Sequence, residues 1–370
     1  MLTEWALGRS IMTLLIRCLL IAVTFCSVHG TVSAQTAPIG SAAPGDVLRP
    51  GHLGRQIGDL ERIIHFYDDL LGTDIQGERD APHAFFASPG LTEFANTPAH
   101  GEYRAVILPI PGTAREPDSG LEMAIEAIEF RNFERHQYVH DLSDVGGSHL
   151  VLVLRDLDSA MERLTEAGVP VISIGGAPLE LPLLYGSGMR KRAVIVRDPD
   201  GYPVELVELT PAPATTAPDD SNIIGARISL TVSDLDATQA LYQDLMGRGA
   251  QFWSSPEFVR DDAYNQLRNT PGAEYRFAAA LIPGSAVALE FIEYRSIPRY
   301  AIAPTIQDIG GGHVLFMIDD MDLFMSRIRA AGLKPLATSG EPVFIAPTVQ
   351  AVFVTDNDNF FVEFMARMPE

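Results

Sequence analysis

The strongest constraint on the fold is an internal repeat that covers most of the chain. The stretch IEAIEFRNFERHQYVHDLSDVGGSHLVLVLRDLDSAMERLTEAG, from Ile125, aligns without a gap with LEFIEYRSIPRYAIAPTIQDIGGGHVLFMIDDMDLFMSRIRAAG, from Leu289. Upstream, IGDLERIIHFYDDLLG matches VSDLDATQALYQDLMG, and downstream RDPDGYPVEL matches TDNDNFFVEF. A repeat of this length predicts two homologous domains in tandem.

The domain boundaries follow from the ends of the two copies. We place the first domain at 46–209 and the second at 222–370, with a linker at 210–221 that is rich in proline, threonine and alanine. Each domain is itself double, because a strand, an aspartate cap and a helix recur twice within it, each time followed by β-rich runs. The run VPVISI, 169–174, is one of these predicted strands. The unit is β-α-β-β-β, and four such units predict an α+β fold.

The first residues predict export. Residues 1–34 have a basic start, a short apolar core and the small-residue end TVSA, which is typical of a secretory signal peptide. The apolar core is too short for a comfortable membrane span. We expect cleavage after Ala34, a flexible lead-in at 35–45, and a periplasmic or secreted mature protein. Both cysteines, Cys18 and Cys26, lie in the leader, so the mature chain has no disulfide or thiolate chemistry.

The net charge of the chain disfavours some classes of binding partner. The formal net charge is -21, and it becomes -22 when Glu4, Arg9 and Arg17 leave with the leader. Such an acidic protein is a poor match for nucleic acid or for an anionic membrane surface. We therefore expect a small-molecule substrate. The oligomeric state stays open, although two fused domains permit a monomer.

Four polar residues stand inside strands that otherwise read as buried. His52 and His149 lie in the first strand of units one and two, and Glu126 and Glu205 lie in the last strand of the same units. A buried carboxylate costs several kcal/mol or more unless a cation, a proton or hydrogen bonds compensate it. Since side chains alternate along a strand, Glu126 shares its face with small Ala124, which leaves room beside the acid.

Two neutral imidazoles and two carboxylates suit a divalent transition metal such as Zn, Ni, Mn or Fe. The carboxylates would neutralise the ion, and the ion would account for the burial of Glu205. A six-coordinate ion would keep two open positions for a bidentate oxygen ligand. The residues therefore predict one divalent ion held by His52, Glu126, His149 and Glu205.

These motifs resemble the vicinal oxygen chelate superfamily, and within it most closely glyoxalase I. HLGRQIGDLERIIHFYDDLLG, IEAIEF, GGSHLVLVLRDLD and VRDPDGYPVELVE occur in the family's order, and the resemblance covers nearly the whole mature chain. It implies two tandem domains of paired βαβββ units that form incompletely closed β-barrels, with the metal inside. It also implies a metal-dependent lyase or isomerase for a small substrate with vicinal oxygens, in which Glu126 or Glu205 moves a proton.

The family allows two arrangements of the ligands. Besides the set within the first domain, which we prefer, a crossed set would use His52, Glu126, His313 and Glu363. In either arrangement Arg227 takes the place of His52 in the other copy. An arginine cannot ligate a metal, and we expect its guanidinium to replace the ion by pairing with Glu290 and Glu363.

Two other functions stay open. An extradiol dioxygenase resembles this fold and uses two histidines and a glutamate, but RKRAVIVRDPDG lacks the histidine and tyrosine that such enzymes carry before DPDG. A binding protein of the bleomycin-resistance type often lacks the ligands altogether. Further candidates for a pocket or a second metal site are His83, His100, Tyr103, His136 and His140.

Overall fold

The computed structural model describes residues 43–73, 75–76, 84–87, 89–98, 100–116, 121–181 and 189–368. The predicted leader, its cleavage site and His83 lie outside the described residues. Within them, no helix has the length and hydropathy needed to cross a membrane.

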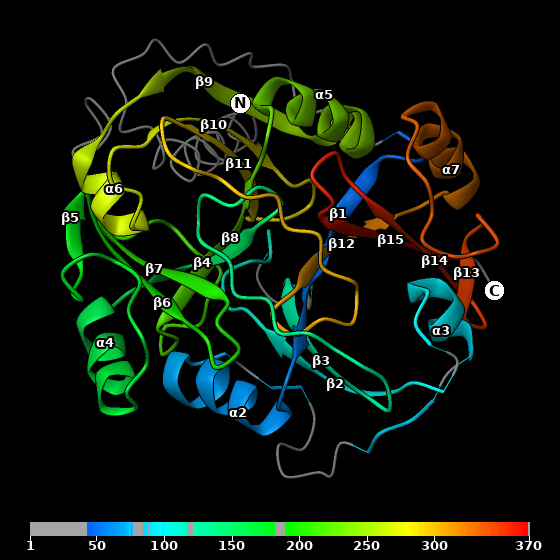
Figure 1. Ribbon diagram of the computed structural model, residues 1–370, viewed down its shortest axis with the longest axis horizontal. Coiled ribbons are helices and arrows are strands. Elements are labelled where there is room, and N and C mark those ends of the chain that lie inside the picture. Colours follow the sequence, from blue (N-terminus) through cyan, green and yellow to red (C-terminus); the bar gives the residue numbers. More distant parts are fainter. Residues whose placement is uncertain are drawn as a thin grey trace, which may run out of the picture.

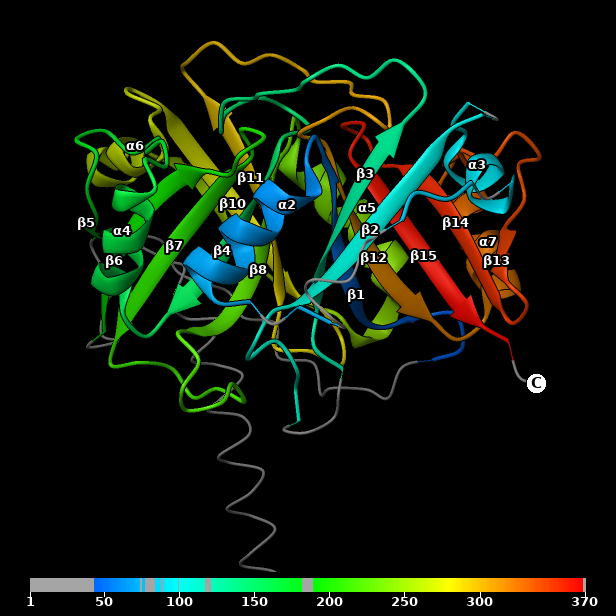
Figure 2. The same ribbon diagram turned by 90° about the horizontal axis from the view of Figure 1, so that it is seen from below.

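Two curled β-sheets stand side by side (Figures 1 and 2). Sheet 1 has seven strands in the order β13 (Val343–Ala346), β14 (Val349–Thr355), β15 (Phe361–Arg367), β12 (Gly312–Ile318), β1 (Val47–Ile57), β3 (Ala124–Arg131), β2 (Glu102–Pro109). Sheet 2 has eight strands in the order β5 (Leu179–Leu181), β6 (Arg190–Arg197), β7 (Pro203–Thr210), β4 (Ser148–Leu154), β8 (Ile223–Thr231), β11 (Ala288–Arg295), β10 (Glu274–Leu281), β9 (Gln251–Val259). The α+β fold with two curved half-barrels is thus as the sequence predicts.

One helix follows the first strand of each unit, as the repeat predicts. The helices are α2 (Leu60–Ile64) with the π-helical η1 (His65–Leu71), α3 (Pro89–Ala95), α4 (Leu157–Glu166), α5 (Leu235–Met246) with the 3-10 turn η2 (Gly247–Gly249), α6 (Asp262–Arg268) and α7 (Met321–Ala330). Of these, α3 and α6 are additional helices in units one and three. Five of the helices begin after an aspartate whose carboxylate accepts a backbone N–H of the first turn: Asp59, Asp156, Asp234, Asp261 and Asp320. These caps satisfy N–H groups that have no partner inside the helix.

The pairing of the units differs from the predicted domain boundary. β1 pairs antiparallel with β12, and β4 pairs antiparallel with β8. Sheet 1 therefore joins unit one to unit four, and sheet 2 joins unit two to unit three. Each sheet takes one unit from 46–209 and one from 222–370, so neither predicted range closes a sheet by itself.

One predicted strand is wrong. VPVISI, 169–174, contributes only an isolated bridge between Val171 and Val196, and the edge strand of that unit is the short β5 instead. Pro170 explains part of this, because it has no N–H to give to a ladder.

The core lies between the sheets and the helices. The outward faces of both sheets and the apolar sides of α2, α4, α5 and α7 form one cluster of buried residues. The concave faces of the sheets point away from this cluster. The concave face of sheet 2 is filled with apolar side chains, whereas that of sheet 1 has a smaller cluster beside α3. The concave face of sheet 1 therefore has fewer buried apolar side chains than that of sheet 2.

Candidate metal centre

Four polar side chains converge on the concave face of sheet 1. His52 Nε2 lies 3.0 Å from Glu126 Oε2, 3.4 Å from Glu363 Oε2 and 3.2 Å from His313 Nε2. His313 Nε2 lies 3.2 Å from Glu363 Oε2. We call His52, Glu126, His313 and Glu363 the first centre.

The strand register explains why these residues meet. Gly54 in β1 is the partner of His313 in β12 on one side and of Glu126 in β3 on the other. A Cβ added at Gly54 would overlap the His313 ring. The glycine thus leaves the space that the imidazole occupies in the middle of the sheet.

The separations fit a shared ion. Neighbouring donors around an ion with bonds of about 2.1 Å lie about 3.0 Å apart in octahedral and about 3.4 Å apart in tetrahedral geometry. The four separations given above cover this range. Ligand atoms of His52, Glu126 and His313 all lie within 4.8 Å of one another, and Glu363 joins this group through the two histidines. Among the described residues, no lysine or arginine lies within 4.0 Å of the carboxylates of Glu126 or Glu363. Two acids with no fixed cation, next to two imidazoles, make a donor set that a divalent transition metal fits.

The pKa values of the first centre also indicate that a positive charge is favoured there. Burial lowers the pKa of His52, but Glu126 and Glu363 outweigh it and raise that pKa to about 10. Burial raises the pKa of Glu363, but hydrogen bonds from His313 and His52 lower it to about 2. The pKa of Glu126 is also lowered by His52, against its burial. Without an ion, a proton on His52 carries the positive charge that the acids require.

Two neighbours hold the His313 ring. Gln56 Nε2 lies 3.0 Å from His313 Nδ1, and Phe353 packs edge-on against the ring with centroids 4.9 Å apart. A histidine that ligates through Nε2 carries its proton on Nδ1 and needs a hydrogen-bond acceptor there. The amide of Gln56 supplies one through its oxygen when it turns over, since the two ends of an amide differ only in assignment.

The first centre is open on the side of β2 and β3. The Glu126 side chain is 24% exposed, compared with 5% for Glu363. Tyr103 in β2 shares the face of Glu126 by strand alternation, and burial together with the charge of Glu126 raises its pKa to about 12. Its ring contacts Phe86 at 4.1 Å and Phe130 at 6.2 Å between centroids. An aromatic wall therefore flanks the exposed acid.

The sequence-predicted set within the first domain does not come together. His149 in β4 and Glu205 in β7 belong to sheet 2, while His52 and Glu126 belong to sheet 1. The physical reason is the pairing of β1 with β12, which brings His313 to His52 in the place given to His149. The crossed set is the one that the structure brings together.

Comparisons with known proteins agree with this fold. Residues 49–206 match the family model of the Glyoxalase/Bleomycin resistance protein/Dioxygenase superfamily. Residues 49–206 belong to the glyoxalase superfamily, and the second half of the chain repeats their fold. The chain is 22% identical to lactoylglutathione lyase GLX1 of Arabidopsis thaliana over 326 residues, which is 84% of this chain and 93% of that protein.

Solved glyoxalase structures share the whole arrangement. Glyoxalase I from Zea mays superposes with a TM-score of 0.52 at 17% identity, covering 86% of this chain and 92% of that chain. A mutant of the same maize enzyme superposes with the same TM-score at 15% identity and covers 86% and 93%. At these identities the likeness concerns the fold alone.

Sheet 2 of this glyoxalase-type fold has polar residues at the positions that match the first centre, but here the carboxylates pair with cationic side chains. His149, Glu205, Arg227 and Glu290, which we call the second centre, lie on its concave face and are at most 3% exposed. Arg227 Nη1 lies 3.8 Å from Glu290 Oε1, as predicted, but the predicted pair with Glu363 is wrong because Glu363 belongs to sheet 1. His149 Nε2 lies 3.4 Å from Glu205 Oε2.

Two cations of the second centre were missed in the sequence. Lys191 Nζ lies 3.0 Å from Glu205 Oε1, and Arg268 Nη2 lies 3.5 Å from Glu205 Oε2. Glu205 thus has fixed partners, and they hold its pKa well below the usual range although burial opposes this. Burial lowers the pKa of His149 to about 4 and raises that of Glu290 to about 7. Lys191 is one of only two lysines in the chain, and its place in a buried strand was the signal that could have identified it.

The other predicted histidines are apart from both centres. His136 is exposed, with Asp308 and Glu134 near its ring, and His140 is buried with its Nε2 2.9 Å from the carbonyl oxygen of Ser148. The two lie in an irregular segment, not on one helix face. His100 is exposed in a turn.

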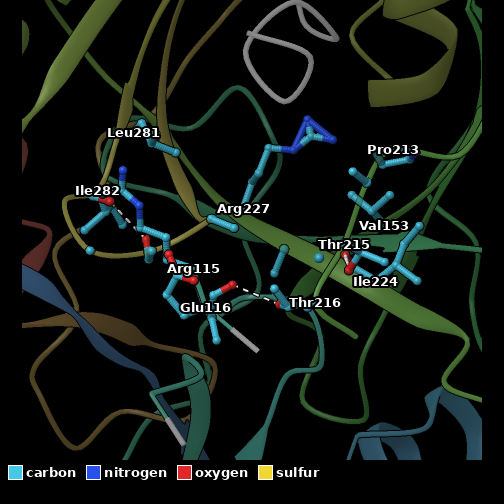
Figure 3. A pocket seen from close by; sticks show the side chains of 18 of the residues that line it. Arg115, Glu116, Val153, Pro213, Thr215, Thr216, Ile224, Arg227, Leu281 and Ile282 are labelled. Atoms are coloured by element: carbon cyan, nitrogen blue, oxygen red, sulfur yellow. Dashed lines mark hydrogen bonds between the residues drawn. The ribbon is translucent and has the colours of Figure 1, made fainter. Parts of the chain in front are cut away.

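A cavity of about 300 Å³ at one end of sheet 2 contains none of the first-centre residues (Figure 3). Its walls come from the linker (Pro213, Thr215, Thr216), from Arg115 and Glu116, and from Leu281 and Ile282. The hydroxyls of Thr215 and Thr216 donate to the carbonyl oxygens of Ile224 and Ala114.

Proposed function

We propose that this protein is an exported, metal-dependent lyase or isomerase of the glyoxalase type that acts on a small substrate with vicinal oxygens. The observation that carries the proposal is the set of four donor separations of 3.0–3.4 Å that link Glu126 to His52, His52 to His313, and both histidines to Glu363, with no lysine or arginine of the described residues beside the acids. A divalent ion bound there would supply Lewis-acid stabilisation of an enediolate-like charge.

The exposed fraction of each of the four side chains indicates its role, either metal binding or proton transfer. His52, His313 and Glu363 are the more buried members and would hold the ion. Glu126 is the most exposed, so it can reach a bound substrate and move the proton. Tyr103 and its aromatic neighbours would cover the substrate and exclude water from that side. Glu205, paired with Lys191 and Arg268 in the other sheet, has no part in this proton transfer.

The residues around the first centre favour a different substrate from the one in the name of the Arabidopsis relative. The Arabidopsis relative is called a lactoylglutathione lyase. The described wall of the first centre is aromatic and its nearest charges are acidic, which is a poor surface for the carboxylates of glutathione. We therefore propose an uncharged, apolar carbonyl compound with an adjacent hydroxyl. The predicted leader supports a periplasmic or extracellular substrate.

Solvent deuterium exchange tests the proposal. The purified protein is loaded with Zn, Ni, Mn or Fe and incubated in D₂O with phenylglyoxal and its hydrate, with and without glutathione, and with an aromatic α-hydroxyketone. We expect metal-dependent exchange or isomerisation of the hydroxyketone, at least 100-fold slower in Glu126→Gln than in wild type. Metal content is measured in parallel and falls to near zero in His313→Ala but not in His149→Ala. Turnover that survives His313→Ala would refute the proposal.

A second candidate, ring cleavage by oxygen, is favoured by one observation. His52, Glu126 and His313 form a two-histidine, one-carboxylate group beside an aromatic wall, which resembles the set of the extradiol dioxygenases. The fourth donor Glu363 at 3.2–3.4 Å favours the lyase. Oxygen uptake by the Fe(II)-loaded protein with a catechol, absent in His313→Ala, would reverse this order.

A further inference from the structure

The two centres occupy the same positions of their sheets. In sheet 1, Gly54 stands between His313 and Glu126. In sheet 2, Ser229 stands between His149 and Glu290 in the same register. Arg227 precedes Ser229 by two residues, as His52 precedes Gly54. Differences between the centres can therefore be compared residue by residue.

Three cations distinguish the second centre from the first. Arg227, Lys191 and Arg268 come from three different elements, β8, β6 and α6, and each is at most 3% exposed. Lys191 and Arg268 lie 3.0 and 3.5 Å from the two oxygens of Glu205, and Arg227 lies 3.8 Å from Glu290. Burying three cations costs free energy unless they are paired, and here all three pair with Glu205 or Glu290. The two acids therefore compensate the buried positive charge.

Neutral residues stand at the matching positions of the first centre. The segment ANTP at 95–98 matches RNTP at 268–271, and its asparagines share the same left-handed backbone, with φ of 51° and 53°, so Ala95 corresponds to Arg268.

Lys191 is matched through the strand register. Ile195 pairs with Glu205 and Phe353 pairs with Glu363, so Lys191, four residues before Ile195, corresponds to Val349. Together with His52 at the place of Arg227, the first centre thus lacks all three cations.

The charges of the two centres follow from this comparison. The first centre contains two carboxylates and two imidazoles and calls for an added cation. The second centre also contains two carboxylates, but three built-in cations already surround them. Where the first centre needs an ion from solution, the second has its positive charge in the chain.

The second centre is also closed. The ring of Tyr264 in α6 stacks on Tyr275 with centroids 5.0 Å apart, within the apolar cluster that fills the concave face of sheet 2. The nearby cavity of about 300 Å³ does not reach Glu205 or Glu290, and a second cavity that Glu290 does line has a volume of about 10 Å³, too small for a substrate. Figure 3 shows the Arg227 side chain extending away from Thr215, Thr216 and Arg115.

We propose that the second centre is a metal site whose ion has been replaced by Arg227, Lys191 and Arg268. This ion cluster holds sheet 2 together without metal and admits no substrate, so the protein binds one catalytic ion per chain. The proposal rests on the proposed function only for the comparison with the first centre.

A gain of metal binding tests the replacement. The triple variant Arg227→His, Lys191→Val, Arg268→Ala is made in a Ser229→Gly background, so that the second centre has the ligands of the first and also the glycine that corresponds to Gly54. We expect it to bind two Co²⁺ per chain where wild type binds one, with a second set of visible d–d bands. The matched control adds His149→Ala to the triple variant and should return to one. A folded triple variant that still binds a single ion would overturn the proposal.

The wild-type protein supplies tests that do not depend on folding of the triple variant. His149→Ala should leave the wild-type Co²⁺ stoichiometry unchanged, and a lost ion would overturn the proposal. Lys191→Met should lower the thermal midpoint by at least 5 °C even in excess chelator, because it leaves Glu205 short of a partner. Lys334→Met, at the other lysine of the chain and exposed, is the control and should not move it. An unchanged midpoint for Lys191→Met would likewise overturn the proposal.

These outcomes separate the proposal from the proposed function. A wild-type protein that takes up no metal at the first centre would remove the proposed function. A second centre that gains an ion in the triple variant would still support the replacement.

Discussion

His52 and His313 lie 261 positions apart in the chain, and their Nε2 atoms lie 3.2 Å apart. Both nitrogens also approach the same oxygen of Glu363, at 3.4 and 3.2 Å. Two imidazole nitrogens at this distance can share one proton or one ion, but their lone pairs repel if nothing lies between them. The relationship therefore identifies the point at which positive charge is needed.

Metal binding should release a proton. The pKa of His52 is raised to about 10 by Glu126 and Glu363, so the metal-free centre is protonated at neutral pH, and a ligand must first lose that proton. We expect the affinity for Zn²⁺ to rise about tenfold per pH unit between pH 7 and 9, and about one proton to leave per ion. Calorimetry in buffers of different ionisation enthalpy measures both.

The raised pKa of His52 also predicts how the free energy of unfolding of the metal-free protein changes with pH. A proton held more tightly in the folded state stabilises it fully below the ordinary histidine pKa, and this contribution is lost as the pH rises toward 10. His52→Gln should remove that loss. For the release of a proton on metal binding, a Zn²⁺ affinity that does not change between pH 7 and 9 would contradict the prediction.

Gly54→Ser should weaken metal binding at least 10-fold. A side chain at Gly54 would occupy the space of the His313 ring and displace it, because the strands cannot separate without breaking the ladder. Gly225→Ser is the control, since atoms around a Cβ there begin only at 4.0 Å. Competition against a chelator gives the affinities, and equal values for both variants would count against the prediction.

Gln56→Leu should also weaken metal binding, by about 10- to 100-fold, because His313 loses the partner of its Nδ1. Gln56→Glu keeps an acceptor and should restore most of the affinity. A structural role alone would make both variants equally weak, so the difference between them is the decisive readout.

Arg55→Met should lower the free energy of unfolding by about 3–5 kcal/mol. The Arg55 guanidinium is fully buried, 3.1 Å from Asp198, and donates to the carbonyl oxygens of Gly310 and Gly311. It ties the turn before His313 to the loop of unit two, and its loss leaves Asp198 buried beside Tyr67. Urea unfolding measures the change. Arg131→Met, at a half-exposed pair with Glu102, should cost less than 1 kcal/mol.

The repeat made the units predictable from the sequence. Helical spacing and the aspartate caps located the helix after Asp59 and the helix after Asp156, and both are present. Alternation along the strand placed Glu126 on the face of Ala124, where it lies. These features depend on neighbours in the chain, which a sequence pattern records directly.

The pairing of the units could not be predicted in this way. His149 and His313 stand in the same motif after the same glycine turn, so either strand could have paired with β1. What decides is the contact between distant strands, and no local pattern encodes it. The same reason hid Arg268, whose guanidinium crosses from α6 to Glu205 in another unit.

The pairing of β1 with β12 has a consequence for synthesis. A ribosome delivers His52 early, but its partners His313 and Glu363 come from the last unit, and Glu363 lies in the final strand. The nascent chain therefore has no assembled centre until β15 has been made. A truncated product that stops before residue 361 lacks Glu363, so a complete first centre forms only after β15 has been synthesised and has paired with β12.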